Sequence, residues 1–224
     1  MELKGKIIDF LGDSITEGVG VTDRVNNRYD KVLKKKCGLA ETYNYGIGGT
    51  RLAHQRKPSA KPRHDLCFCG RAYDLKKTAD IVVVYGGVND YIHGDAPFGE
   101  IGDTTPATFC GGVYFLMDLL KTLHPGKTIV FMTPARLNYE GNDGSKPSTR
   151  PTKGPDAKPI LSYIDVIEKT AAQFEIPVLN LYEKLGIDPT KEEDRKKYTI
   201  DGLHFNDDGH HILAARLQEF LEVL

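Results

Sequence analysis

The amino-acid sequence predicts an α/β fold in three layers, α/β/α, with a central parallel sheet of about five strands. Short apolar runs rich in β-branched residues recur along the chain, as in strands that are buried on both faces. Longer stretches with apolar residues at every third or fourth position separate these runs, which is typical of amphipathic helices. Strands and helices that alternate in this way form parallel sheets with helices on both faces.

Five apolar runs are predicted to be the strands. They are residues 6–11, 42–45, 81–85, 128–132 and 178–180. Four longer stretches are predicted to be helices: residues 26–36, 106–123, 158–174 and 208–224. In the last of these, Leu213, Leu217 and Phe220 belong to one apolar stripe with polar residues opposite, so we expect this helix to cover the core.

The composition favours one ordinary globular domain. The chain has 224 residues, of which 40% are hydrophobic, and we expect a single domain over residues 1–224. Lys and Arg number 30 against 31 Asp and Glu. A net charge near zero gives no reason to expect nucleic acid or an anionic membrane as a partner, and it is compatible with a small neutral substrate.

Targeting and redox signals are weak. The start of the chain, MELKGKIIDFLGDS, lacks the basic stretch, apolar run and cleavage site of a secretory signal. No run approaches the roughly 20 apolar residues that cross a bilayer, so we expect no membrane insertion. The four cysteines are too few for a disulfide scaffold and lack paired zinc spacing. These features favour a cytoplasmic protein with reduced thiols, although a processed secreted form is also compatible with them.

Two long segments, 51–77 and 138–159, interrupt the alternation and are predicted to be loops. Such loops commonly build the site of an α/β protein, at the carboxyl ends of parallel strands. Segment 51–77 contains eight Lys or Arg and two Asp. This excess of positive charge could attract an anionic substrate such as an acidic sugar, but a solvated basic surface is the more ordinary explanation.

A serine follows the first predicted strand on a glycine-containing turn. The sequence Gly12-Asp13-Ser14 begins where the strand ends, so the Ser14 hydroxyl and the neighbouring backbone N–H groups are expected at the carboxyl edge of the sheet. Ser14 is therefore a candidate nucleophile. Taken alone, Asp13 or Ser14 could equally cap a following helical turn.

Two further glycine-containing turns follow predicted strands. After residues 81–85 comes GGVND, which places Asn89 at the same edge, where its amide could stabilise a developing oxyanion. After residues 42–45 comes GIGGT, whose glycines permit a close approach of the backbone to a ligand. This spacing is not the dinucleotide-binding fingerprint. Each turn could also be purely structural, since Asn and Gly are ordinary turn residues.

A carboxylate and an imidazole precede the last predicted helix in the sequence DGLHFN. The three-residue offset between Asp201 and His204 across a turn can bring the two side chains into contact. A carboxylate partner would fix the tautomer of the ring and stabilise its protonated form. Considered alone, the two residues could be a loop ion pair or a capping arrangement, and the pair gains significance beside Ser14.

Together these segments resemble the SGNH hydrolase family, also called GDSL-like lipases and esterases, over nearly the whole chain and in the same order. GDSITEG resembles the nucleophile segment of the family at Ser14, and GVND resembles its asparagine segment at Asn89. DGLH resembles the acid and base segment at Asp201 and His204. GIGGT resembles the more loosely defined glycine segment at Gly49.

The resemblance implies a flavodoxin-like fold and a triad in which His204, oriented by Asp201, accepts the Ser14 proton. The acyl group of an ester would pass to Ser14 and then to water. Because the base and the oxyanion donors supply this chemistry, we expect neither a metal nor an organic cofactor. Phe205 stands where many relatives have proline, which affects the loop and removes no catalytic group.

The resemblance also implies an oxyanion hole. Its donors would be the backbone N–H groups of Ser14 and Gly49 and the side-chain amide of Asn89. Gly48 is an alternative to Gly49 as the second donor, and the sequence does not decide between them.

Four residues are candidates for the substrate pocket. They are Asp13, beside the nucleophile, and Tyr91, His93 and Phe98, which follow the Asn89 turn just beyond the carboxyl end of a strand. Tyr139, in the later loop, is a weaker candidate for the same wall. The three residues after the turn could equally be loop packing.

The expected function is hydrolysis of short-chain acyl esters, with O-acetyl groups of carbohydrates as candidate substrates and a small-molecule or carbohydrate ester as the partner. Two alternatives remain. The same acyl-enzyme could transfer its acyl group to an alcohol or a sugar. A non-catalytic carbohydrate-binding protein could keep the fold, since fold alone does not establish activity. The oligomeric state is open.

Overall fold

The computed structural model describes residues 1–224 and contains one five-stranded, all-parallel sheet in the order β2-β1-β3-β4-β5. The predicted fold class is confirmed, and the predicted bounds of two strands, β3 and β4, are also confirmed. The ends of the other three differ by one residue. The strands are β1 (Ile7–Gly12), β2 (Glu41–Gly46), β3 (Ile81–Tyr85), β4 (Thr128–Met132) and β5 (Val178–Leu179).

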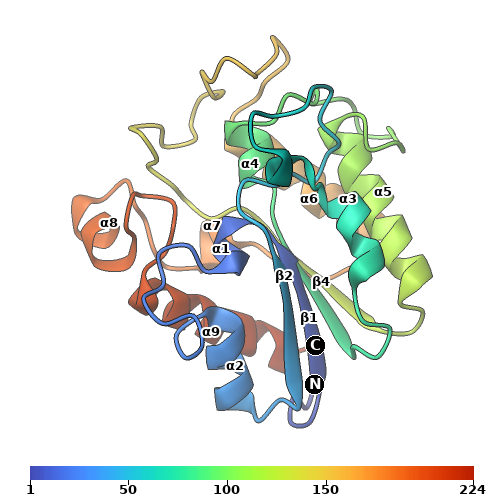
Figure 1. The fold of residues 1–224 in the computed structure, drawn as a ribbon, viewed down its shortest axis with the longest axis vertical. Coiled ribbons are helices and arrows are strands. Elements are labelled where there is room, and N and C mark those ends of the chain that lie inside the picture. Colours follow the sequence, from blue (N-terminus) through green and yellow to red (C-terminus); the bar gives the residue numbers. More distant parts are fainter.

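Helices cover both faces of the sheet (Figure 1). On one face lie α2 (Tyr29–Cys37) and α9 (Asp207–Glu222), and on the other α3 (Phe68–Arg71), α5 (Phe109–Leu123) and α6 (Ile160–Gln173). The four longer ones correspond to the four predicted helices. Their predicted starts at α2, α5 and α6 were two or three residues too early, because turns and caps precede the first helical residue.

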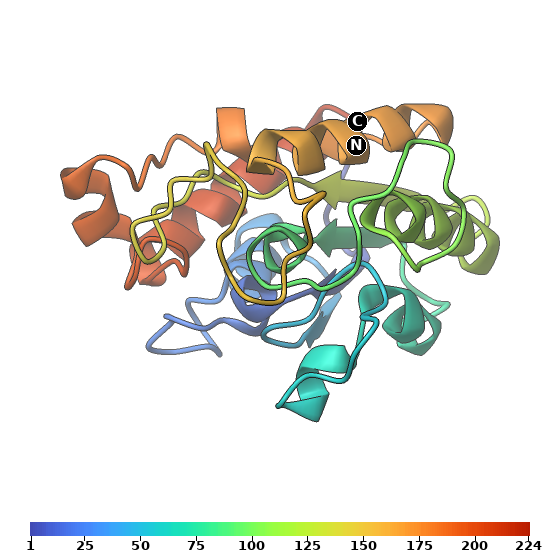
Figure 2. The same cartoon turned by 90° about the horizontal axis from the view of Figure 1, so that it is seen from above.

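The register of the strands aligns their carboxyl ends. Gly12, the last residue of β1, pairs with Gly46 of β2 on one side and with Tyr85 of β3 on the other. Two short helices, α1 (Ser14–Glu17) and α4 (Val88–Ile92), begin just beyond this edge. The edge lies at the top of the sheet in Figure 1, and Figure 2 views it from above. The segments that follow β1, β2 and β3 therefore start side by side.

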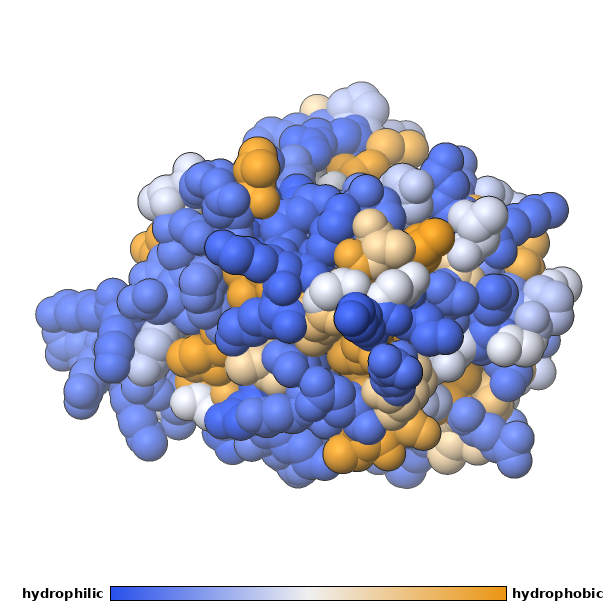
Figure 3. All heavy atoms as spheres, turned by 90° about the horizontal axis from the view of Figure 1, so that it is seen from below, coloured by the Kyte–Doolittle hydropathy of each residue, from blue (hydrophilic) through white to orange (hydrophobic).

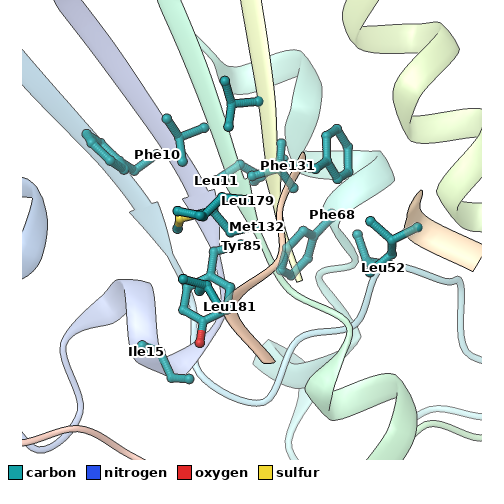
Figure 4. Packing of buried hydrophobic residues seen from close by; sticks show 14 of the residues in the cluster. Phe10, Leu11, Ile15, Leu52, Phe68, Tyr85, Phe131, Met132, Leu179 and Leu181 are labelled. Atoms are coloured by element: carbon teal, nitrogen blue, oxygen red, sulfur yellow. The ribbon is translucent and has the colours of Figure 1, made fainter. Parts of the chain in front are cut away.

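The core is one cluster of 51 buried apolar residues on the two faces of the sheet. Phe10, Leu11, Phe131 and Met132, from the strands, lie among side chains contributed by helices and loops, including Phe68 (Figure 4). All five residues of β3 are buried, as expected for the middle strand of a parallel sheet. Burial of apolar surface on this scale is the main source of stability of such a domain.

The two long segments differ from one another. Segment 138–159 has no regular helix or strand, which confirms its prediction as a loop. The prediction for segment 51–77 was partly wrong, because it contains α3 and two 3-10 turns, η1 (Pro62–Asp65) and η2 (Ala72–Asp74). These elements are shorter than five residues, too short to give a helical period in the sequence.

Four further short helices were missed: α1, α4, α7 (Leu181–Lys184) and α8 (Glu192–Tyr198). Helix α8 has no buried residue and projects from the body of the molecule (Figure 1). No helix is both long and apolar enough to cross a membrane. Seen from below, the surface is mainly hydrophilic with scattered apolar groups (Figure 3). The four cysteines are free thiols.

Candidate active site

Ser14 is the first residue of α1, two positions after the end of β1. The chain turns sharply here: a Cβ on Gly12 would lie 2.0 Å from Thr16 Oγ1, so only glycine fits. The first N–H groups of a helix have no acceptor within the helix, and the Ser14 N–H is one of these. The turn thus places a hydroxyl and a backbone donor together at the edge of the sheet.

Asp13 caps α1 and does not line a pocket, which corrects the prediction made for it. Its side chain is 1% exposed, and its Oδ1 accepts a hydrogen bond of 3.0 Å from the Ile15 N–H. Its Oδ2 has no partner. Burial raises the pKa of Asp13 to about 6. Asp13 thus holds the start of the helix that carries Ser14.

His204 lies between Ser14 and Asp201 in one line of hydrogen bonds. Its Nε2 is 2.9 Å from Ser14 Oγ, and its Nδ1 is 2.7 Å from Asp201 Oδ2. The other carboxylate oxygen, Oδ1, accepts the backbone N–H groups of Leu203 at 3.0 Å and His204 at 2.8 Å. The turn between the two residues therefore fixes the carboxylate, and the carboxylate fixes the ring.

The surroundings keep Asp201 ionised. Burial by itself would raise the pKa of Asp201, but hydrogen bonds from the His204 ring and from two backbone N–H groups more than offset this, so its pKa lies below its usual value. The ring of Tyr139 stands edge-on to the imidazole at 6.3 Å between centroids, which places this weaker candidate beside His204.

The loop of His204 is closed at its ends by a bridge and held at its middle by the segment after β4. Thr199 and Phe205 form an antiparallel bridge, and Asn138 donates its N–H to Gly202 O at 2.9 Å. Phe205 is 1% exposed and belongs to the core cluster. Its large side chain therefore anchors the loop.

The two neighbouring glycines of the GIGGT turn have different environments. The Gly48 N–H donates to Glu17 Oε2 at 2.6 Å, whereas the Gly49 N–H has no acceptor in the protein. Gly49 adopts a φ of +78°, and a Cβ there would lie 2.6 Å from the ring of His64. The geometry therefore favours Gly49 over Gly48 as a donor that is available to a ligand, which the sequence left undecided.

Asn89 is buried in the first turn of α4, and one N–H of its amide donates to Thr50 O at 3.1 Å. An amide has two N–H groups, so the second remains available. Asp90 accepts the N–H groups of Leu52 at 2.9 Å and Ala53 at 3.0 Å. Burial raises the pKa of Asp90 to about 6 despite these hydrogen bonds. The turns after β2 and β3 are thus joined by two adjacent side chains of α4.

Arg71 is a residue of this region that the sequence did not reveal. Its guanidinium, in the loop predicted at 51–77, is buried and donates to Gly12 O at 3.1 Å and Thr50 Oγ1 at 2.8 Å. It also donates to the carbonyl oxygens of Tyr45 and Leu66. Burial lowers its pKa to about 10. One side chain therefore joins the ends of β1 and β2, and no spacing pattern in the sequence indicated it.

The prediction that Tyr91 lines the pocket was wrong. Its side chain is fully buried, and its hydroxyl oxygen lies within hydrogen-bond distance of two acceptors, Asn142 Oδ1 at 2.9 Å and Lys146 O at 2.8 Å. Phe98 packs in the same aromatic cluster, 5.0 Å from the ring of Tyr163 between centroids. Both are packing residues, which was the alternative considered for them. His93 is half-buried and borders a cavity.

A hydroxyl in contact with an imidazole, a carboxylate behind the ring and unoccupied N–H groups nearby are the groups that acyl transfer requires. No three His, Cys, Asp or Glu side chains are grouped so that they could hold a metal ion.

Residues 10–212 match the GDSL-like lipase/acylhydrolase family. None of the curated proteins matches the chain. The match spans the four segments described above.

Several solved structures share the fold. A protein from Lactobacillus plantarum is 27% identical and has a TM-score of 0.81, with 98% of each chain covered. A carbohydrate acetylesterase family member from Sinorhizobium meliloti is 16% identical, with 97% of this chain and 98% of that chain covered and a TM-score of 0.65. The aryl esterase of M. smegmatis is 18% identical, with 98% and 99% covered and a TM-score of 0.65. At such identities the last two likenesses concern the fold.

Proposed function

The chain belongs to the GDSL-like lipase/acylhydrolase family and is an ester-hydrolysing enzyme, and we propose that it cleaves short-chain acyl esters with Ser14 as nucleophile. The observation that carries this proposal is the line of hydrogen bonds from Ser14 Oγ through His204 to Asp201, at 2.9 Å and 2.7 Å. A serine hydroxyl is a weak nucleophile until a base takes its proton, and His204 is in position to do so.

In the proposed reaction, His204 accepts the Ser14 proton through Nε2 while Ser14 Oγ attacks the ester carbonyl. Asp201 holds the tautomer with the proton on Nδ1 and stabilises the imidazolium that forms. The imidazolium then gives its proton to the departing alcohol, which leaves an acyl group on Ser14. Water, deprotonated by the same ring, attacks the acyl carbon, and the bond to Ser14 Oγ breaks as the imidazolium returns the proton to that oxygen and the acid is released.

We propose that the N–H groups of Ser14 and Gly49 and the free N–H of Asn89 hold the oxyanion. The absence of a protein acceptor for Gly49 and the single bond from Asn89 to Thr50 support this role. Donors that are fixed before the reaction need not reorganise as negative charge develops on the oxygen, which is why they stabilise the transition state.

Polar surroundings favour a sugar or a similar alcohol as one part of the substrate. A cavity of about 590 Å³ borders Asp201, and its lining includes Asn138, Arg195, Thr199 and only one hydrophobic residue, Ile200. The lining contains neither Ser14 nor His204, so the cavity lies beside the triad and offers hydrogen bonds to the hydroxyl groups of an alcohol part that extends past Asp201. We therefore propose O-acetyl groups of carbohydrates as the substrate class.

The proposal is tested with p-nitrophenyl acetate, butyrate and octanoate. Ser14→Ala and His204→Ala should each lower kcat by at least about 10⁴-fold, because nucleophile and base act as a unit. The acetate should be the best of the three esters.

Ser162→Ala, a serine replacement on α6 outside this site, is the matched control and should keep the wild-type rate. Equal rates in wild type, Ser14→Ala and His204→Ala would contradict the proposed mechanism. A preference for the octanoate would contradict the proposed substrate class while leaving the mechanism in place.

A further inference from the structure

A cavity of about 500 Å³ lies where segment 51–77, segment 138–159 and the chain after α4 meet. Its lining includes three cationic side chains, Arg51, Arg56 and Lys57, together with His93. It includes one carboxylate, Asp95. The cavity therefore has an excess of positive charge in a protein whose overall charge is nearly balanced.

The carboxylate of Asp95 is already occupied. It accepts the backbone N–H of Arg56 at 2.9 Å through Oδ1 and that of Lys57 at 3.0 Å through Oδ2. The side chains of Arg56 and Lys57 form no salt bridge with any carboxylate. Asp95 thus holds the loop in place through its backbone and leaves both side-chain cations without a partner.

Arg51 lies between the cavity and the candidate active site. It is 6% exposed, and its guanidinium donates only to backbone carbonyls, those of Gly49 at 2.9 Å, His64 at 3.2 Å and His93 at 3.4 Å. Its Nε has no acceptor, and the guanidinium forms no salt bridge with any carboxylate. Burial lowers the pKa of the Arg51 guanidinium, and the carboxylates of Asp90, Asp65 and Asp95 act in the opposite direction without forming a salt bridge with it. A guanidinium that is buried without a directly paired carboxylate is costly to bury.

The positive charges around the cavity also affect the nearby imidazole of His93. Burial lowers its pKa to about 4, and repulsion from Arg150, Arg51, His64 and Lys153 adds to the effect of burial. A neutral His93 adds no further charge, but it can donate or accept a hydrogen bond at the wall of the cavity.

We propose that this cavity binds a carboxylate of the ester substrate, so that the enzyme prefers anionic esters over neutral ones. The proposal rests on the proposed function, because the cavity borders Arg51, which contacts Gly49 of the proposed oxyanion hole. A carboxylate held there would receive hydrogen bonds from cations that have no partner in the protein. Charge-assisted hydrogen bonds of this kind are among the stronger polar contacts.

Two matched pairs of esters test the preference and show which part of the ester carries the charge. For the acyl side, p-nitrophenyl hydrogen succinate is compared with its neutral methyl ester. For the alcohol side, acetate release from an O-acetylated methyl galacturonoside is compared with release from its neutral methyl ester. In at least one pair, kcat/KM should be about tenfold higher for the anion, and the ratio should fall with added salt.

The double variant Arg56→Glu/Lys57→Glu should abolish this ratio. Lys35→Glu/Lys36→Glu introduces the same change of charge at exposed residues of α2 and should leave the ratio at its wild-type value. Ratios of about one in both wild-type pairs would overturn the proposal. The proposal would also be overturned if Lys35→Glu/Lys36→Glu lost the preference for anionic esters as fully as Arg56→Glu/Lys57→Glu does. The preference would then come from the net charge of the protein and not from the cavity.

Failure of the proposed function can be told apart from failure of this proposal. If the wild-type enzyme hydrolyses the neutral esters, the proposed function stands, and the ratio of kcat/KM between the anionic and the neutral ester tests the carboxylate site. If it hydrolyses none of the esters, calorimetric titration with succinate and with methyl galacturonoside decides, methyl galactoside being the neutral control. Binding of either anion that disappears in Arg56→Glu/Lys57→Glu would support the cavity as a carboxylate site without catalysis. No binding of either would overturn it.

Discussion

Two adjacent peptide N–H groups, those of Gly48 and Gly49, differ in whether the protein occupies them. Glu17 accepts the first, and no group accepts the second. Glu17 is also paired with Arg63 at 3.0 Å, which holds its carboxylate in place and keeps its pKa below the usual value despite partial burial. The short helix that begins with Ser14 therefore also orients the turn that contains Gly49.

Asn89 gives the first prediction at the residue scale. Asn89→Ala removes the proposed amide donor, so kcat for p-nitrophenyl acetate should fall by about 10²–10³-fold while KM changes by less than about threefold. Asn26→Ala, an exposed asparagine in the turn before α2, is the control and should retain the wild-type kcat. A loss confined to KM would instead indicate a role in ground-state binding.

Arg71 gives a second prediction. Arg71→Lys keeps the charge, but one ammonium cannot reach the four oxygens of Gly12, Tyr45, Thr50 and Leu66 that the planar guanidinium contacts. We expect kcat to fall at least about tenfold with little change in KM. If the nucleophile and the oxyanion donors are misplaced, the transition state is stabilised less, while binding of the substrate changes little.

A thermal unfolding scan accompanies this measurement. If Arg71 served stability alone, Arg71→Lys would lower Tm and leave kcat of the folded fraction unchanged. Lys76→Arg, a change between the same two residue types in the same segment, is the control for expression and folding.

Among the elements, sequence patterns revealed those that contribute a stripe to the core and missed those that do not. Helices α5 and α6 each bury one apolar face and were predicted. Helix α8 buries no residue, so it has no apolar period to detect. Its acidic first turn and basic last turn suit a helix dipole, but this signal alone is weak.

Helix α9 carries a buried histidine whose protonation should affect stability. His210 is fully buried, and its Nδ1 accepts the Tyr29 N–H at 3.3 Å. Burial lowers its pKa to about 3, from the usual 6.5. Between these two pKa values the unfolded chain binds a proton at His210 that the folded protein does not bind. The free energy of unfolding is therefore not reduced by this group above pH 6.5, and it decreases as the pH falls below that value.

Urea unfolding at pH 7.5 and pH 5.0 tests this. On lowering the pH, wild type should lose about 2 kcal/mol more of its free energy of unfolding than His210→Gln, whose side chain does not titrate. His211→Gln, at the exposed neighbouring position, should lose as much as wild type. An identical loss in wild type and His210→Gln would contradict the assigned burial effect.

At the scale of the whole molecule, the sequence predicted which segments meet but not all that holds them together. Four motifs followed strand ends or preceded a helix, and parallel strands align their ends at one edge, so Ser14, Gly49 and Asn89 could be placed together in advance. The buried polar contacts of Asp90 and Arg71 follow only from the three-dimensional path of the loops, and nothing in local spacing encodes that path.

The same limit explains the errors at Tyr91 and Asp13. Both lie in motifs at the carboxyl edge of the sheet, but helical geometry turns adjacent side chains in different directions. In α4, Asn89 is positioned toward Thr50 while Tyr91 enters the aromatic cluster. A position within a motif therefore indicates the region of a side chain better than its direction.

The contact between Ser14 and His204 joins residues 190 positions apart in the chain. During synthesis the serine leaves the ribosome early, whereas the imidazole that would activate it is translated much later. On the proposed mechanism, a nascent or truncated chain that ends before residue 204 carries an unactivated alcohol and cannot attack esters in its surroundings. Reactivity would therefore begin only when the turn before α9 reaches the edge of the sheet, so that the arrangement of the site along the chain delays activity until folding is nearly complete.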